Sequence, residues 1–432
     1  MSKSRISGIK GRRVWDSRGR PTIEVEVVLA NGARGRAIAP AGASTGSGEA
    51  IELRDGGSKL GGFDVGFAVG HVNAEIAAAL IGADAVDQAS IDRILVELDG
   101  TPKKSRLGAN ALVAASMAVL HAAATSEGKA LYEYLLGDRQ ALIPLPEIQI
   151  FGGGAHAGRR VDVQDFMVVA PAAGSFDQAL EWTAEIYHAA QEMLSEAGQL
   201  QGVADEGGFW PAFDSNAATL DALMRAIERA GLTPGQEIFI ALDVAASQFF
   251  RDGRYLLARD GQALDSDGMC EMLRQWLHRY PILSIEDPLA EADFEGIRRF
   301  TTACGREVQI VGDDFLVTNA DRVRAFAAAD ACNAVLVKPN QVGTVTEAGL
   351  AVEAAREVGW GAIASARSGE TEDVTIVHLA VGWGVDQLKV GSFARSERMA
   401  KWNEVLRIEA GLRERGRFAG WAPFRRFLRQ RP

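Results

Sequence analysis

Three short apolar segments in the second half of the chain each end on a carboxylate side chain. They are EIFIALD, which ends at Asp243, PILSIED, which carries Glu286, and VQIVGDD, which carries Asp313. An apolar run of this length is typical of a buried strand, and an acid at its end needs a partner. Any one of these acids could simply cap a helix or join a salt bridge. Together they predict successive strands that bring oxygen ligands to one point, a ligand set that suits Mg²⁺.

The second half of the chain alternates between strand-like and helix-like segments. Further candidate strands are DFMVVA, AVLVK, GAIAS and QLKVG, and the segments between them, such as EAGLAVEAAREVG, have helical periodicity. This alternation predicts an α/β fold, a mostly parallel β/α barrel over residues 139–432. Functional residues are then expected at the carboxyl ends of the strands.

The first part of the chain has a different pattern. TIEVEVVLANGARGRAIAP predicts two strands joined at Asn31-Gly32, a dipeptide typical of hairpin turns. Apolar residues then recur at helical intervals from residue 65 to about residue 135. Pro144 and Pro146 interrupt any helix beyond that point and indicate a boundary. We therefore expect residues 1–138 to form an α+β domain that caps the barrel.

Composition argues against several classes of function. The net charge of −11 disfavours nucleic acid or an anionic membrane surface as the main partner. Cys270, Cys304 and Cys332 form no disulfide framework and no zinc motif, which suits a reducing cytoplasm. The start of the chain lacks the apolar core of a signal peptide. The apolar stretch from Ala109 contains polar residues, so we expect a buried helix rather than a membrane span.

Two lysines and an arginine follow predicted strands. Lys338 ends NAVLVK, and a lysine near bound cations is pushed toward its neutral form and can act as a base. Lys389 ends another strand and could pair with a substrate carboxylate. Arg367 and Ser368 offer a guanidinium fork and a hydroxyl, which together suit a phosphate. The simpler alternatives are surface lysines at a barrel rim and an ordinary loop.

A second group of polar residues lies near the start of the predicted barrel. Gln164 and Asp165 occur in VQDF, and Glu206 occurs in DEGG. Two carboxylates in one pocket raise the pKa of one of them, which can then serve as a general acid. His156, in GGGAHAG, could orient a substrate or donate a proton, although a lone histidine is more often structural.

A glycine-rich segment, GASTGSGE, lacks the ending of a phosphate-binding loop. Its glycines could instead act as hinges of a mobile lid, on which Ser44 or Thr45 supplies an oxygen.

These segments together resemble the enolase family. The stretches that carry the resemblance include WDSRGRPTIEVEV, AGASTGSGEAIELRDG, VADEGGF, SIEDPL, VGDDFLVTN, VKPNQVGTVTE, SARSGETED and ARSERMAKWNE, and they extend over residues 6–412. The resemblance implies an N-terminal α+β domain followed by an enolase-type (β/α)8 barrel. It also implies the use of a Lys or His base with Mg²⁺.

The resemblance implies a role for each matched residue. Asp243, Glu286 and Asp313 match the ligands of a first Mg²⁺, and Ser44 matches a ligand of a second, so two Mg²⁺ ions per site are expected. Lys338 matches the base that removes the proton next to the substrate carboxylate.

Other matched residues surround the rest of the substrate. Glu206 matches the acid that assists the loss of hydroxide, and Lys389 matches the lysine that faces the substrate carboxylate. The matched phosphate contacts are Arg367 and Ser368, and the remaining matched substrate positions are His156, Gln164 and Asp165. A homodimer or a higher assembly is also implied.

The chain departs from the family pattern mainly on the side of the leaving group and the lid. SARSGETED has Ala366 where the family has histidine, and QDF has Asp165 where the family has glutamate. The other departures are Gly48 in the lid, Gly152 and Ala155 in GGGAH, and Gln248 in DVAASQF, where the family has glutamate.

Three functions are compatible with this combination. The first, which we favour from the extent of the similarity, is an enolase that interconverts 2-phospho-D-glycerate and phosphoenolpyruvate. The second is the enolase-like carboxyphosphonoenolpyruvate synthase of phosphonate biosynthesis, which would keep the enolising half of the site. The third is a catalytically inactive binding protein, and the retention of both lysines and all three acids argues against it.

Overall fold

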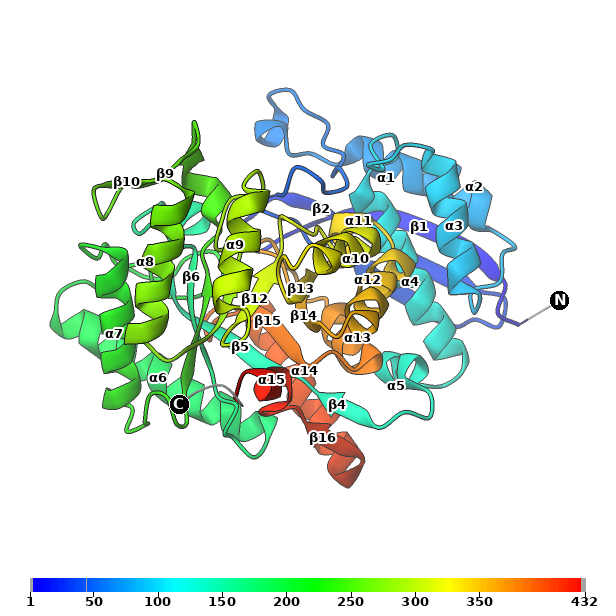
Figure 1. Cartoon of the computed structure of the whole chain (residues 1–432). Helices are drawn as coiled ribbons and strands as arrows, with labels where there is room; N and C mark the ends of the chain where they lie inside the picture. Colours follow the sequence, from blue (N-terminus) through cyan, green and yellow to red (C-terminus); the bar gives the residue numbers. More distant parts are fainter. Residues whose placement is uncertain (1–2, 44, 429–432) are drawn as a thin grey trace.

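The computed structural model describes residues 3–43 and 45–428. A closed eight-stranded barrel forms its centre, in the order β11-β12-β13-β14-β15-β5-β6-β7 (Figure 1). The barrel strands are β5 (Leu145–Gly152), β6 (Asp165–Val169), β7 (Phe239–Asp243), β11 (Ile282–Glu286), β12 (Gln309–Gly312), β13 (Ala334–Val337), β14 (Gly361–Ser365) and β15 (Gln387–Gly391). The predicted enolase-type barrel is confirmed.

Two features of the barrel differ from a simple β/α alternation. β6 runs antiparallel to both β5 and β7, whereas the other neighbouring pairs are parallel. β5 itself was not anticipated, because Pro144 and Pro146 suggested only a boundary. Those prolines exclude a helix, but a strand tolerates Pro146 near its first residue.

Helices surround the barrel, and most begin where a side chain accepts a hydrogen bond from a backbone N–H of the first turn. Ser175, Ser215, Asp265, Asp293, Asn319 and Thr344 cap helices in this way. The helices of this region are α6 (Phe176–Glu196), α7 (Asn216–Arg229), α8 (Ser266–Arg279), α9 (Phe294–Cys304), α10 (Ala320–Ala328), α11 (Pro339–Val342), α12 (Val345–Glu357), α13 (Thr375–Trp383) and α14 (Ser396–Leu412). A small antiparallel sheet of β8 (Phe250–Arg251), β9 (Arg254–Leu257) and β10 (Gln262–Leu264) follows β7.

The N-terminal region contains a three-stranded antiparallel sheet of β1 (Ile6–Trp15), β2 (Pro21–Leu29) and β3 (Arg34–Ile38). The predicted hairpin at Asn31-Gly32 joins β2 to β3, and Gly32 has a positive φ of 87°. β1 was not predicted. The expected helices follow as α1 (Gly66–His71), α2 (Ala77–Leu80), α3 (Gln88–Asp99), α4 (Ala109–Ser126) and α5 (Leu131–Leu136), with a π-helical turn, η2 (Val72–Ile76), between the first two.

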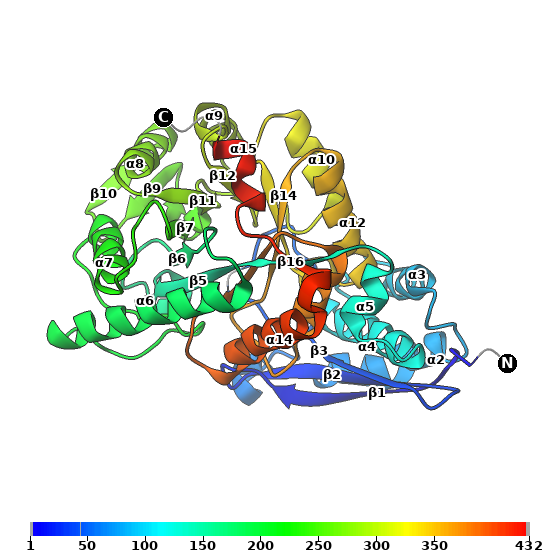
Figure 2. The same cartoon turned by 90° about the horizontal axis from the view of Figure 1, so that it is seen from below.

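Helix α4 is the core of the N-terminal region. It packs across β2 and β3, and Figure 2 shows it beside the blue sheet. Its length and composition would let it cross a membrane, but 83% of it is buried inside the protein, as expected for a core helix. Side chains also join this region to the barrel: His121 Nε2 lies 2.8 Å from Thr375 Oγ1, and Lys104 Nζ lies 2.6 Å from Glu347 Oε1.

The C-terminal tail closes the end of the barrel where β5 and β7 begin. β16 (Gly416–Phe418) pairs with β4 (Ala141–Ile143), and α15 (Arg425–Leu428) follows a short turn. Phe424 and Phe427 pack with Leu145 and Phe239, the first residues of β5 and β7. The tail is therefore docked against this end of the barrel, and the opposite end remains for the functional site.

The contact between α4 and β3 requires glycine at position 35. A Cβ atom there would lie 2.2 Å from Ala118 O and 2.2 Å from Ala122 N, both in the backbone of α4. We expect Gly35→Ala to separate helix and sheet and to lower the free energy of unfolding by about 1–3 kcal/mol. Urea unfolding followed by circular dichroism measures this change. Gly8→Ala in β1 is the matched control, because nothing lies within 4 Å of its added Cβ; equal effects of both variants would contradict the argument.

Candidate active site

The three predicted acids meet at the carboxyl ends of neighbouring strands. Asp243 ends β7, Glu286 ends β11, and Asp313 directly follows β12. Asp243 and Glu286 are direct partners in the β7–β11 register. All three side chains are buried. The structure therefore places all three carboxylates in one part of the barrel mouth.

Two lysines supply the opposite charge. Lys389 Nζ, on β15, lies 2.7 Å from Asp243 Oδ2, 2.8 Å from Glu286 Oε2 and 3.5 Å from Asp165 Oδ2. Lys338 Nζ lies 2.5 Å from Asp313 Oδ2. Burial lowers the pKa of each lysine, but the carboxylates raise it more, so the net shift is upward and both hold their protons.

The acids fit a hard divalent cation. Glu286 Oε1 is buried and has no hydrogen-bond partner among the described residues. Burial, together with nearby Asp243, raises the pKa of Glu286 well above its usual value. A cation bound by these oxygen ligands would give Glu286 Oε1 a partner and would lower the pKa of Glu286, since it favours the ionised carboxylate. A second group of acids lies beside them: oxygens of Asp287, Asp313 and Asp314 lie within 4.8 Å of one another.

Asp287 has a structural role beside the predicted ligands. Its side chain accepts hydrogen bonds from the backbone N–H groups of Asp313 and Asp314, at 2.8 and 2.9 Å. It therefore fixes the turn that carries Asp313. Ser44, the predicted ligand of a second Mg²⁺, lies outside the described residues.

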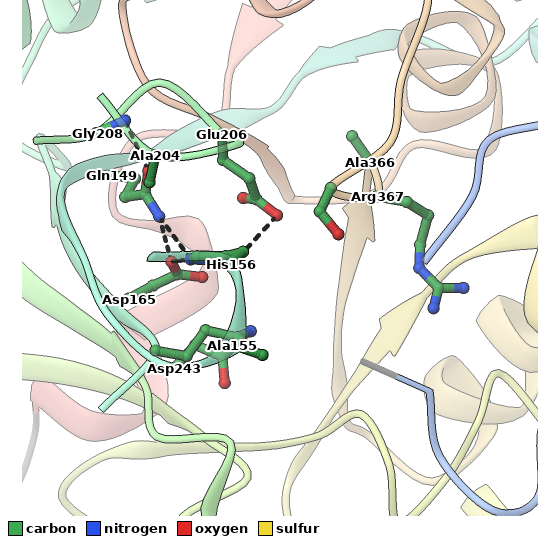
Figure 3. Close-up of polar contacts among 12 residues, drawn as sticks. Gln149, Ala155, His156, Asp165, Ala204, Glu206, Gly208, Asp243, Ala366 and Arg367 are labelled. Carbon is green, nitrogen blue, oxygen red and sulfur yellow. Dashed lines mark hydrogen bonds and ion pairs between the residues drawn. The ribbon is translucent and has the colours of Figure 1, made fainter. Parts of the chain in front are cut away.

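A histidine separates the carboxylates on the other side of the site. His156 Nε2 lies 3.1 Å from Asp165 Oδ1, and its Nδ1 lies 3.7 Å from Glu206 Oε1 (Figure 3). Burial lowers the pKa of His156, but Asp165 and Glu206 outweigh it and raise the pKa to about 9. Gln149 also donates to Asp165 Oδ1, and its own Oε1 accepts from Gly208 N at 2.9 Å.

Asp165 is not the member of this carboxylate pair whose pKa rises. Burial would raise the pKa of Asp165, but the charges of His156 and Lys389 outweigh burial and lower it to about 2. The imidazolium lies between Asp165 and Glu206 and cancels the repulsion that the sequence argument assumed.

The predicted phosphate contacts follow β14. The Arg367 guanidinium lies 3.0 Å from Glu49 Oε2 and donates to Asn340 Oδ1 at 2.9 Å. Arg398, fully buried on α14, donates to the backbone carbonyls of Arg367 and Ser368 at 2.7 and 2.6 Å. Glu49 thus connects the lid segment to the barrel, and Arg398 fixes the loop after β14.

Several of these groups line one small cavity. Its lining residues are His156, Gln164, Glu206, Asp243, Lys338, Ser365, Ala366, Arg367, Ser368, Lys389 and Val390. In Figure 3 the Glu206 carboxylate lies between His156 and Ala366. The structure therefore brings both predicted catalytic residues, Lys338 and Glu206, to the same cavity, together with the site of the main sequence departure.

Two other departures are close-packed glycines. A Cβ atom at Gly48 would lie 2.7 Å from an Arg322 guanidinium nitrogen, so any side chain there requires Arg322 to move. A Cβ atom at Gly152 would lie 3.2 Å from Ala204 Cβ and 3.3 Å from Gln149 Nε2. The neighbours of both glycines therefore occupy the space that a side chain would need.

Comparison with known proteins agrees with this fold. Residues 6–135 match the family described as "Enolase, N-terminal domain", and residues 140–426 match "Enolase, C-terminal TIM barrel domain". The chain belongs to the enolase family. It is 47% identical over 421 residues to "Enolase 1" of Desulfitobacterium hafniense (strain Y51), covering 97% of this chain and 96% of that protein. Enolase-family membership at this identity makes the chain a phosphopyruvate hydratase-like lyase.

Several residues of this enolase site were missed from the sequence. Gln149 is a polar residue between Ile148 and Ile150, and a polar side chain inside an apolar strand signals a buried network. Glu49 and Arg398 lie in stretches that carry the family resemblance, but without the fold neither could be assigned a partner.

The raised pKa of His156 predicts a pH dependence of stability. Between pH 6.5 and about 9 the folded protein holds a proton on His156 that the unfolded chain has lost. The stabilisation is complete below pH 6.5 and decreases above it by about 1.4 kcal/mol per pH unit. The difference in free energy of unfolding between the unsubstituted protein and His156→Gln should therefore shrink over this window. Urea titrations at several pH values measure it.

The control for that comparison is His188→Gln, because His188 is exposed on α6. An equal pH dependence in both variants would mean that the effect does not come from the buried imidazole. A pH-independent effect of His156→Gln would contradict the assignment of the buried proton.

Proposed function

We propose that this protein is a Mg²⁺-dependent lyase that interconverts 2-phospho-D-glycerate and phosphoenolpyruvate plus water. The observation that carries the proposal is the division of one cavity into two chemical sides. Lys338 and Lys389 lie among carboxylates that fit a cation, and Glu206 and His156 form an acid–base pair. A proton abstraction followed by loss of hydroxide needs both sides.

Asp243, Glu286 and Asp313 would hold the first Mg²⁺, and the family resemblance assigns Ser44 to the second. When bound, Mg²⁺ would neutralise the negative charge that develops on the substrate carboxylate as the proton leaves. The buried Glu286 Oε1 supports this assignment.

Lys338 is the proposed base. It borders the cavity, and its Nζ lies 2.5 Å from Asp313. A lysine accepts a proton only in its neutral form, so Lys338 must lose one before it acts. Lys389, with two carboxylate contacts under 3 Å, keeps its positive charge and would face the substrate carboxylate.

Glu206 is the proposed acid for the departing hydroxide. His156 Nδ1 lies 3.7 Å from Glu206 Oε1, so the proton that His156 holds can reach the departing hydroxide through Glu206. Asp165 pairs with Nε2 of His156, the ring nitrogen that does not face Glu206, and Gln149 donates to the same Asp165 oxygen. Arg367 and Ser368 would bind the phosphate, and Arg398 positions their backbone. Gln164 would complete the substrate pocket.

The expected substrate class, cellular location and oligomeric state follow from the same family resemblance. The substrate is a small phosphorylated carboxylate, and we expect a cytoplasmic homodimer or a higher homo-oligomer. We also propose that the N-terminal domain ends at residue 138 and that the barrel domain begins at residue 139.

Ala366 favours a second candidate, carboxyphosphonoenolpyruvate synthase. Ala366 borders the cavity beside Glu206, at the position where the family pattern has histidine. This enzyme would retain the enolising side of the site and use a different partner on the other side.

The first test is the assay of 2-phospho-D-glycerate dehydration by phosphoenolpyruvate absorbance, with Mg²⁺ and with excess EDTA. We expect activity only with Mg²⁺. Lys338→Ala should lower kcat by about 10²–10⁴-fold and should abolish exchange of the proton next to the carboxylate, because the base is lost. Lys129→Ala is the control, since Lys129 is on the surface and pairs with Glu127 at 2.9 Å. Normal exchange in Lys338→Ala would exclude Lys338 as the base.

A second variant distinguishes the two candidates. If the protein dehydrates 2-phospho-D-glycerate slowly because of Ala366, then Ala366→His should raise kcat by roughly 10- to 100-fold, toward the usual effect of one polar catalytic group. Full enolase-like turnover of the unsubstituted protein would exclude the altered chemistry. Proton exchange without dehydration, in both the unsubstituted protein and Ala366→His, would favour the synthase. The absence of both exchange and dehydration would favour an inactive binding protein.

A further inference from the structure

A chain of hydrogen bonds links the loop that carries His156 to the proposed metal ligand Asp243. Ala155 N donates to Gln248 Oε1 at 2.8 Å, and Gln248 Nε2 donates to Gln164 Oε1. Gln164 Nε2 then donates to Asp243 Oδ2 at 2.8 Å. Three segments are joined in this way: the 3-10 turn η3 (Ala155–Ala157), the residue before β6, and the turn η4 (Ala246–Phe249) after β7.

The direction of every hydrogen bond in this chain is determined by its two ends. The backbone N–H of Ala155 can only donate, so Gln248 must turn its oxygen toward it. Asp243 Oδ2 accepts from Lys389 Nζ at 2.7 Å, and Gln164 turns its nitrogen toward the same oxygen. The remaining nitrogen of Gln248 and the remaining oxygen of Gln164 then face each other as donor and acceptor.

The local backbone is built around these contacts. Gly154 has a positive φ of 56°, and a Cβ atom there would lie 3.0 Å from Gln248 Oε1 and 3.2 Å from Gln164 Cα. Ala245, which precedes η4, has a φ of 45°, an uncommon conformation for a residue with a side chain. Both positions let the two turns approach closely enough for Gln248 to bridge them.

Position 248 is also a departure of this chain from the family pattern, which has glutamate there. A glutamate could still accept from Ala155 N, but it has no N–H group to donate to Gln164. The Gln164 amide would then lie between two carboxylates and could turn its nitrogen toward only one of them. Glutamine at position 248 removes this competition, so that Gln164 donates to Asp243.

The chain of bonds also distinguishes the two oxygens of Asp243. Gln164 and Lys389 both donate to Oδ2, at 2.8 and 2.7 Å. All side-chain hydrogen bonds that Asp243 accepts from the described residues end on this oxygen, which leaves Oδ1 for a cation. We propose that Gln248 is a positioning residue that acts through Gln164 to orient Asp243 for Mg²⁺ and to tie the His156 loop to this ligand. The proposal rests on the Mg²⁺ site of the proposed function.

The test is a double-mutant cycle on Mg²⁺ affinity, measured by calorimetry without substrate. Gln248→Leu should weaken Mg²⁺ binding by about 10-fold, the lower end of the effect of losing an outer-shell partner. Gln164→Leu should have a similar effect, and the double variant should bind no more weakly than either single variant, because Gln248 acts through Gln164. Gln275→Leu, on the exposed face of α8, is the control for the change of residue type.

A second measurement tests the loop without any metal. Arg159 and Arg160 follow η3 and offer trypsin two cleavage points in the loop that Gln248 holds. Gln248→Leu should speed cleavage there by about fivefold, the effect of one lost hydrogen bond. Gln164→Leu should have a smaller effect, because the bond between Ala155 and Gln248 remains.

The outcomes separate the two proposals. Unchanged Mg²⁺ affinity in Gln248→Leu, or additive losses in the double variant, would overturn the role of Gln248 while leaving the Mg²⁺ site intact. Failure of the unsubstituted protein to bind Mg²⁺ would overturn the proposed function, and with it the effect on the metal. Unchanged trypsin cleavage would overturn the tie to the loop in either case.

Discussion

The site depends on the balance of buried charge at one end of an apolar barrel. Asp243, Glu286 and Asp313 are removed from water, and a buried carboxylate stays ionised only beside cations or donors. Lys389 and Lys338 provide that charge at 2.5–2.8 Å. Leaving one buried charge unpaired costs about 3–5 kcal/mol, a large fraction of the net stability of a domain, so these five side chains constrain one another's positions.

The rest of the fold leaves these charged side chains accessible to a substrate. The tail with Phe424 and Phe427 closes one end of the barrel, so the strand ends that carry charge open at the other. The N-terminal region reaches over that opening, where Glu49 pairs with Arg367. At the proposed phosphate site, a substrate phosphate would compete with Glu49 for the Arg367 guanidinium.

Much of this arrangement could be predicted where the signal is local. β7, β11 and β12 each combine a short apolar run with a terminal acid, and the hairpin at Asn31-Gly32 follows from turn chemistry. β5 was missed because its prolines resemble a boundary, and the reversed direction of β6 has no local signature, since a strand pattern is the same in both directions. The lowered pKa of Asp165 could not be predicted from the sequence, because it depends on where the fold places His156 and Lys389 around this carboxylate.

The order of residues by itself shows the strands that end on acids, the lysines and the departures at Ala366 and Gln248, because each belongs to one short segment. It also shows the family, through several such segments in the same order. The order of residues does not show which carboxylate each lysine pairs with. It also does not show the protonated state of His156 or the direction of the hydrogen bonds through Gln164. These properties depend on distances between side chains from different strands and loops, and Coulomb energies and hydrogen bonds act over a few ångströms of space rather than along the chain. Folding brings those groups together, so the chemical state of the site follows from the three-dimensional arrangement.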